Sequence, residues 1–221
     1  MRSGTIAAAI AGLAVAGGAA NAQAATVAVD AGCYLSGSTV TASGTGFTAN
    51  GPVNFAFDGQ VSGSGVADPA GNITSPLTAP ILPSGSFQHT YSLAAQDQSN
   101  PALAATVPVN VTARVATVVP HRARPRRRVK FGIHGLIPGK PVYLHYVFHG
   151  RQRYVRKLGT AKAPCGSLTA RRRFFPVNRP KVGTWTFQLD NRHRYSKSTQ
   201  PRIRGPVTIF NVLKSSAASA F

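Results

Sequence analysis

Apolar and polar residues alternate in short segments from residue 25 onward. The clearest is Val53–Phe57, in which every second residue is apolar and Asp58-Gly59 follows as a two-residue hairpin turn. Period-two alternation is typical of strands, and no stretch shows the period of an amphipathic helix. In the first half we expect strands at 26–28, 38–44, 53–57, 60–66, 73–77, 89–97 and 104–111. Short strands separated by turn residues predict a β-sandwich.

The second half repeats these landmarks in the same order. Residues 129–157 are typical of a strand, a tight turn, a second strand, a hairpin and a third strand, and further strands are expected at 168–175, 183–190 and 206–209. The turn 135–142 matches 46–53, and the two final strands match 90–97 and 108–111. A motif used twice predicts one domain type in tandem. The pattern does not decide whether the Tyr143 or the Leu144 side of its strand faces the core.

The first half also has a recognisable order of motifs. A strand ends in Gly44-Thr45-Gly46-Phe47, a Pro-Val strand and Asp58-Gly59 follow, then a turn at 68–72 and a closing Val-x-Val strand. Residues 25–113 thus resemble the immunoglobulin-like repeats of bacterial secreted proteins, of the IPT/TIG or Big type. The resemblance implies a spacer or adhesive module rather than an enzyme. The disulfide and core Trp of antibody domains are missing from this half.

The N-terminus predicts export. Arg2 precedes an apolar run at 6–20, and Ala22-Gln23-Ala24 is a cleavage site for a signal peptide. We therefore predict an all-β protein of two tandem immunoglobulin-like β-sandwiches, secreted or associated with the cell envelope. The expected segments are a signal peptide at 1–24, a sandwich at 25–113, a basic Pro/Arg linker at 114–128, a divergent basic sandwich at 129–213 and a flexible tail at 214–221.

Charge separates the halves. Residues 25–113 contain no Lys or Arg, whereas residues 114–221 carry 24 of them against one acid, Asp190. Burying unpaired Arg is costly, so most of these charges must lie on the surface. We expect two clusters to bind polyanions, one in the linker and one on strands: Arg124, Arg126, Arg127 and Arg128, and Arg151, Arg153, Arg156, Arg171, Arg172 and Arg173.

The partner predicted for this surface is an anionic cell-wall or surface polymer. Extracellular nucleic acid is the alternative, because Arg alternates with aromatic residues in 151–157 and 171–175 and could pair phosphates while the rings stack on bases. An anionic lipid surface is a further possibility, and a structural spacer whose charge only keeps it soluble remains open. No cofactor and no small-molecule substrate are expected.

The two cysteines fall one in each half. Export favours a disulfide between Cys33 and Cys165, which would fasten one domain to the other, while two buried free thiols remain the alternative.

The sequence offers few residues that could bind a metal or carry out catalysis. His134, His145 and His149 have no carboxylate near in sequence, so we expect histidines on a half-exposed basic strand rather than a metal site. Asp190 alone, explained by a turn, cannot supply paired carboxylates, so no enzyme is expected.

Overall fold

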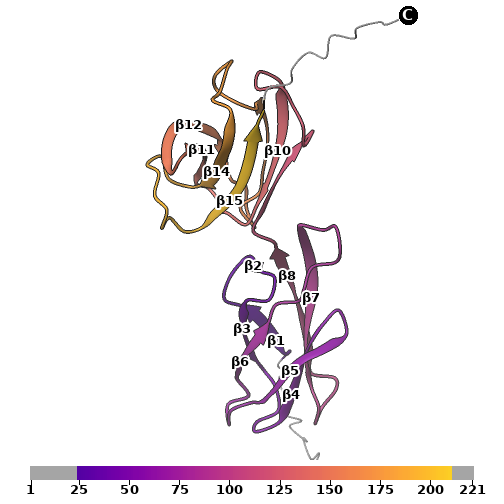
Figure 1. Ribbon diagram of the computed structural model, residues 1–221. Helices are drawn as coiled ribbons and strands as arrows, with labels where there is room; N and C mark the ends of the chain where they lie inside the picture. The colour runs from indigo at the N-terminus through magenta and orange to yellow at the C-terminus, as the bar shows by residue number, and fades with distance from the viewer. Residues whose placement is uncertain (1–23, 211–221) are drawn as a thin grey trace, which may run out of the picture.

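The computed structural model describes residues 24–210, which form two β-sandwiches arranged end to end (Figure 1). The predicted signal peptide, apart from Ala24, and the predicted tail lie outside the described residues. Every regular element in this range is a strand, and none of its residues forms a helix long and apolar enough to cross a membrane.

The first sandwich has a three-stranded and a five-stranded sheet. Their orders are β1-β3-β6 and β2-β8-β7-β4-β5, antiparallel except for the parallel pair of β2 and β8. The Asp58-Gly59 turn joins β4 to β5 as predicted, with both residues at positive φ. The bounds are β1 (Thr26–Val29), β2 (Tyr34–Leu35), β3 (Thr39–Thr45), β4 (Pro52–Phe57), β5 (Gln60–Val66), β6 (Ile73–Thr78), β7 (Gln88–Asp97) and β8 (Ala104–Thr112).

The second sandwich repeats this plan with sheets β13-β10-β9 and β12-β11-β14-β15. As β4 pairs with β5 and β7, so β11 pairs with β12 and β14, which confirms the tandem immunoglobulin-like fold class. The bounds are β9 (Val115–Val119), β10 (Arg128–His134), β11 (Pro141–Phe148), β12 (Arg151–Thr160), β13 (Leu168–Arg173), β14 (Gly183–Asp190) and β15 (Arg202–Ile209).

The segment predicted as a linker belongs to the second sandwich. Strand β9 lies inside it and pairs with β10 from Val115 to Val119, and Arg128 is already the first residue of β10. The intervening loop is tied down, because the backbone carbonyls of Pro125 and Arg127 accept hydrogen bonds from residues 175 and 174. The prediction of an open linker was therefore wrong. The arginines of this segment favoured a linker, and the apolar and small residues of β9 that precede most of them were therefore not interpreted as a strand.

Aromatic side chains dominate the second core. Trp185 and Phe187 of β14 pack against Phe175, with ring centroids 5.2 and 5.3 Å apart, and Tyr146 lies 4.9 Å from Phe187. Leu144 and Tyr146 face this core, which settles the parity of β11. The opposite face of β11 is also buried at His145, where Tyr195 lies across it. With both faces covered, alternation alone could not reveal the core side.

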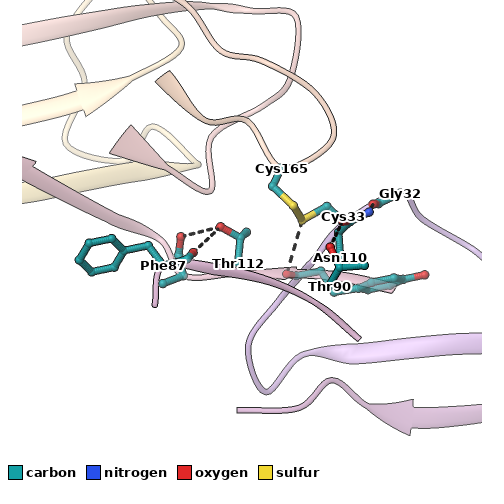
Figure 2. The surroundings of a disulfide bond; sticks show 9 residues. Gly32, Cys33, Phe87, Thr90, Asn110, Thr112 and Cys165 are labelled. Carbon is teal, nitrogen blue, oxygen red and sulfur yellow. Dashed lines mark hydrogen bonds between the residues drawn. A yellow bond between two sulfur atoms is a disulfide. The ribbon is translucent and has the colours of Figure 1, made fainter. Parts of the chain in front are cut away.

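A disulfide between Cys33 and Cys165 joins the domains (Figure 2). It links the loop before β2 to the loop before β13, with Cα atoms 5.3 Å apart, and confirms the predicted pairing. The Asn110 amide holds the first loop by donating to the Gly32 carbonyl at 3.1 Å. Phe87 crosses the boundary in a second contact, 5.6 Å from the His134 ring.

Candidate polyanion-binding surface

Four cations lie together on the outer face of the β13-β10-β9 sheet. Arg128 stands directly opposite Arg173, and Lys130 stands opposite Arg171. All four are exposed, while the intervening Val129 points into the core. Side chains directly opposite on one face are about 5 Å apart at Cβ, and like charges placed so repel each other. We call Arg128, Lys130, Arg171 and Arg173 the cation quartet.

Arg156 and Arg172, both predicted to bind polyanions, also make hydrogen bonds between the two sheets. Arg172 lies opposite Val129 on the core side of β13, and its guanidinium donates to the Leu158 carbonyl of β12 at 2.9 Å. Arg156 of β12 donates in return to the Arg173 carbonyl at 3.0 Å. These bonds cross from one sheet to the other where the edge strands β12 and β13 meet. The two arginines therefore close an edge of the sandwich, with part of their donor capacity used.

The other predicted arginines surround the same end of the domain. Arg124, Arg126 and Arg127 are exposed on the loop that leads into β10, next to Arg128. Arg151 and Arg153 follow the hairpin at 149–150, at the end of β11 remote from the disulfide. The structure thus brings the two predicted clusters to one end of the second sandwich, away from the first domain. This end carries the quartet, the loop arginines and the hairpin arginines.

No carboxylate neutralises these cations among residues 24–210. The one ion pair in this range joins His145 to Asp190, and both side chains are fully buried. Asp190, the sole acid of the basic half, is therefore unavailable to the surface. Within the described part of the chain, solvent and mobile ions are therefore the only counter-charges of the cation quartet and its neighbours. Such a surface attracts polyanions through release of their condensed counterions.

The His145–Asp190 pair anchors a segment on the outer face of the four-stranded sheet. His145 Nε2 lies 3.2 Å from Asp190 Oδ1 and 3.0 Å from the Arg192 carbonyl, and Nδ1 lies 3.0 Å from Gln152 Oε1. The carboxylate and the carbonyl beside Nε2 can only accept, so Nε2 carries a proton and donates toward them. Gln188 adds a bond of 2.7 Å to Asp190 and another of 2.9 Å to the Ser196 carbonyl.

The pair shifts both pKa values. Burial alone lowers the pKa of His145, but the hydrogen bond and charge of Asp190 outweigh it and raise the pKa above its ordinary value. Burial raises the pKa of Asp190, but bonds from His145, Gln188 and the Arg192 N–H hold it below its ordinary value. The expectation that these histidines lie on a half-exposed strand is wrong for His145. Sequence distance concealed its carboxylate partner, 45 residues away.

Across residues 24–210 no three His, Cys, Asp or Glu side chains gather as metal ligands. The aromatic residues between the arginines point inward: Phe174 and Phe175 are buried, and Tyr154 is half-buried against the core. These rings are not free to stack on bases. What the surface offers is charge, so it suits backbone-type anion contacts rather than base recognition.

Sequence reasoning missed Lys130 as a member of the quartet. The signal was present, because alternation from the buried Val129 and Phe131 places residues 128 and 130 on one outward face. The opposition of β10 and β13 was not readable, since pairing of strands 40 residues apart depends on topology. The sequence therefore predicted the charge but not its arrangement in facing pairs.

The sequence matches no protein-family model and no curated protein. Among solved structures, the fibronectin(III)-like modules of Clostridium thermocellum CbhA align at 14% identity and a TM-score of 0.29, over 74% of this chain and 83% of theirs. The tetra-tandem repeat of a large adhesion protein aligns at 15% identity and a TM-score of 0.30, over 83% of this chain and 47% of that one. The human OSCAR ligand-binding domain aligns at 12% identity and a TM-score of 0.33, over 85% of this chain and 98% of that one. At these identities and TM-scores the alignments carry no argument about this chain, so its function is argued from its own surface.

Proposed function

We propose that the protein is an exported, non-enzymatic module whose second domain binds anionic polymers of the cell envelope. The observation that supports this most directly is the cation quartet, in which two pairs of like charges face each other without a carboxylate among the described residues. Such an arrangement destabilises the isolated fold, and a polyanion lying along the sheet relieves the repulsion. The first sandwich, with no Lys or Arg, acts as a spacer.

The cross-domain disulfide supports an oxidising location outside the cytoplasm, where such bonds persist. The buried rings favour a partner read through charge alone, such as a phosphate- or carboxylate-rich wall polymer, over single-stranded nucleic acid. The guanidinium groups suit either anion, since Arg binds both in a bidentate manner.

Binding at varied salt tests the proposal. The full chain is titrated with purified wall polymer, with inorganic polyphosphate and with duplex DNA as a polyanion of known charge density. Four quartet contacts predict a slope of about −3.6 for log affinity against log salt on duplex DNA. The double variant R171Q/R173Q should make that slope shallower by about 1.8.

The matched control is K140Q/K162Q, which removes the same charge from two exposed lysines at the disulfide end of the domain. We expect it to retain the slope. If the full chain ignores all three polymers at low salt, or both variants change the slope equally, the quartet does not bind polyanions. Single-stranded DNA is titrated as a fourth polymer, and a preference for it over the other three at high salt would show that the nucleic-acid alternative is correct.

A further inference from the structure

The second sandwich has an apolar groove along the edge opposite Arg156 and Arg172. It lies between β9 and β15, the last strands of their sheets, and has a volume of about 760 Å³. Its floor is made of core residues, among them Phe131, Phe187 and Leu189. Ligand-binding clefts in proteins are mostly apolar and have volumes of about 300–1,000 Å³.

The first sandwich shows what normally fills this space. Strand β1 begins 13 residues before β3, and β9 begins 13 residues before β10. When the two domains are aligned on these strands, Tyr34 and Ala123 correspond, because each lies eight residues after the start of β1 or β9. Tyr34 is 6% exposed and belongs to β2, which pairs with β8 and closes the edge. Ala123 belongs to no strand and lines the groove. A large side chain in one domain is thus replaced by a methyl group in the other.

A second position differs in the same direction. Val107 lies opposite Leu93 and just before Pro108, and Gly205 lies opposite Phe187 and just before Pro206. Val107 packs against the first core, whereas Gly205 leaves Phe187 open to the groove. A Cβ at Gly205 would meet no atom within 4 Å. Two small residues at matched sites therefore create the opening.

The rim of the groove is cationic. Arg122, Arg124, Arg127 and Arg204 line it, together with His121, and no acid does. An apolar floor beneath an arginine rim matches an amphiphile with a hydrocarbon chain and an anionic head. An added peptide strand fits less well, because Pro206 stands in the middle of β15 and has no N–H to donate.

We propose that this groove binds a single long acyl chain ending in a carboxylate, with the chain between β9 and β15 and the head at the arginine rim. This function goes beyond polymer binding and uses different residues, apart from Arg124 and Arg127, which belong to both surfaces. The apolar contact should set affinity through chain length, since each buried methylene strengthens binding by about fourfold.

The test is displacement of 11-(dansylamino)undecanoic acid from the full chain by defined competitors. Dodecanoate, with two more methylenes, should bind about 15-fold tighter than decanoate. Dodecyltrimethylammonium should bind at least about tenfold weaker than dodecanoate, because the rim repels its head. If chain length has no effect, or the cationic head binds equally well, the proposal is wrong.

Variants separate the groove from the polyanion surface. A123Y and G205V each refill the opening as the first domain does, and each should weaken dodecanoate about tenfold or more while leaving the salt slope for polyphosphate unchanged. R122Q/R204Q should weaken dodecanoate but not dodecanol, and K140Q/K162Q should change neither. Unchanged dodecanoate affinity in both A123Y and G205V overturns the proposal. So does an increase of more than about tenfold on deleting residues 211–221, which would identify the chain's own end as the occupant.

Discussion

The buried His145–Asp190 pair should control the stability of the second domain, and Asp190→Asn tests this. The substitution keeps the size of the side chain but removes the negative charge that faces a fully buried imidazole. Removing one partner of a buried ion pair costs about 3–5 kcal/mol, because the other charge is left without compensation. For a domain of this size, a loss of about 3 kcal/mol lowers the melting temperature by roughly 12–24 °C.

The effect must depend on pH. The raised pKa of His145 means that its contribution is complete below the unfolded value of 6.5 and is lost as pH rises through the folded pKa. The lowered pKa of Asp190 means that its contribution is present above 3.8 and is lost as pH falls through the folded pKa. The difference between the wild type and Asp190→Asn should therefore be largest between about pH 4 and 6.5 and should shrink on either side.

Fluorescence of the single tryptophan measures this directly. Trp185 is 2% exposed in the second core, so its emission follows the unfolding of that domain alone. Asp97→Asn is the matched control: Asp97 is equally buried but accepts from the N–H groups of Thr48, Ser99 and Asn100, with no histidine. It should leave the Trp185 transition unchanged. A shift below about 3 °C for Asp190→Asn at pH 5, or an equal shift at pH 5 and pH 9, would refute the reasoning.

Three further outcomes are expected. While the first domain stays folded, the Cys33–Cys165 bond restricts only the unfolded segment of about 50 residues between the end of that domain and Cys165. Reducing the bond should therefore lower the stability of the second domain by about 4 kcal/mol, measured in denaturant titrations followed by tryptophan emission. Gly166→Ala should lower the same midpoint, because Gly166 has φ +65° and a Cβ would collide with the Leu136 carbonyl; an unchanged midpoint would contradict this. Tyr34→Ala should destabilise the first domain by about 3–5 kcal/mol. Calorimetry should show a lower melting temperature for the first domain and an unchanged one for the second.

Much of the strand plan could be predicted from alternation and turn residues. The hairpin at Asp58-Gly59 and the three strands within 129–157 lie where the sequence indicated. Two strands and one strand orientation were not predicted, for physical reasons. β9 was hidden by the arginines that follow it, and β2 is two residues long, too short for any period. The parity of β11 was ambiguous because a loop that begins more than 45 residues further along the chain, with Arg192 47 residues away, covers its outer face at His145.

The candidate surface was predictable only in composition. The sequence shows that the arginines must be exposed on average, but not that Arg156 and Arg172 are partly engaged in bridging two sheets. Nor does it show that Lys130 faces Arg171, because opposition across a sheet depends on register. These are consequences of tertiary pairing, and local pattern carries no information on them.

The two sandwiches close their edges by different chemistry, and this explains how one fold accepts such unequal charge. The first closes with an apolar ring, Tyr34, on a short extra strand. The second closes one edge with guanidinium groups that donate to backbone carbonyls, which an arginine-rich sequence can supply without a single carboxylate. Its other edge stays open over Ala123 and Gly205, rimmed by arginines. Repulsion among the remaining cations opposes folding, and the disulfide offsets it by restricting the unfolded chain. A basic surface is therefore kept at the expense of stability, as expected if its charge serves binding.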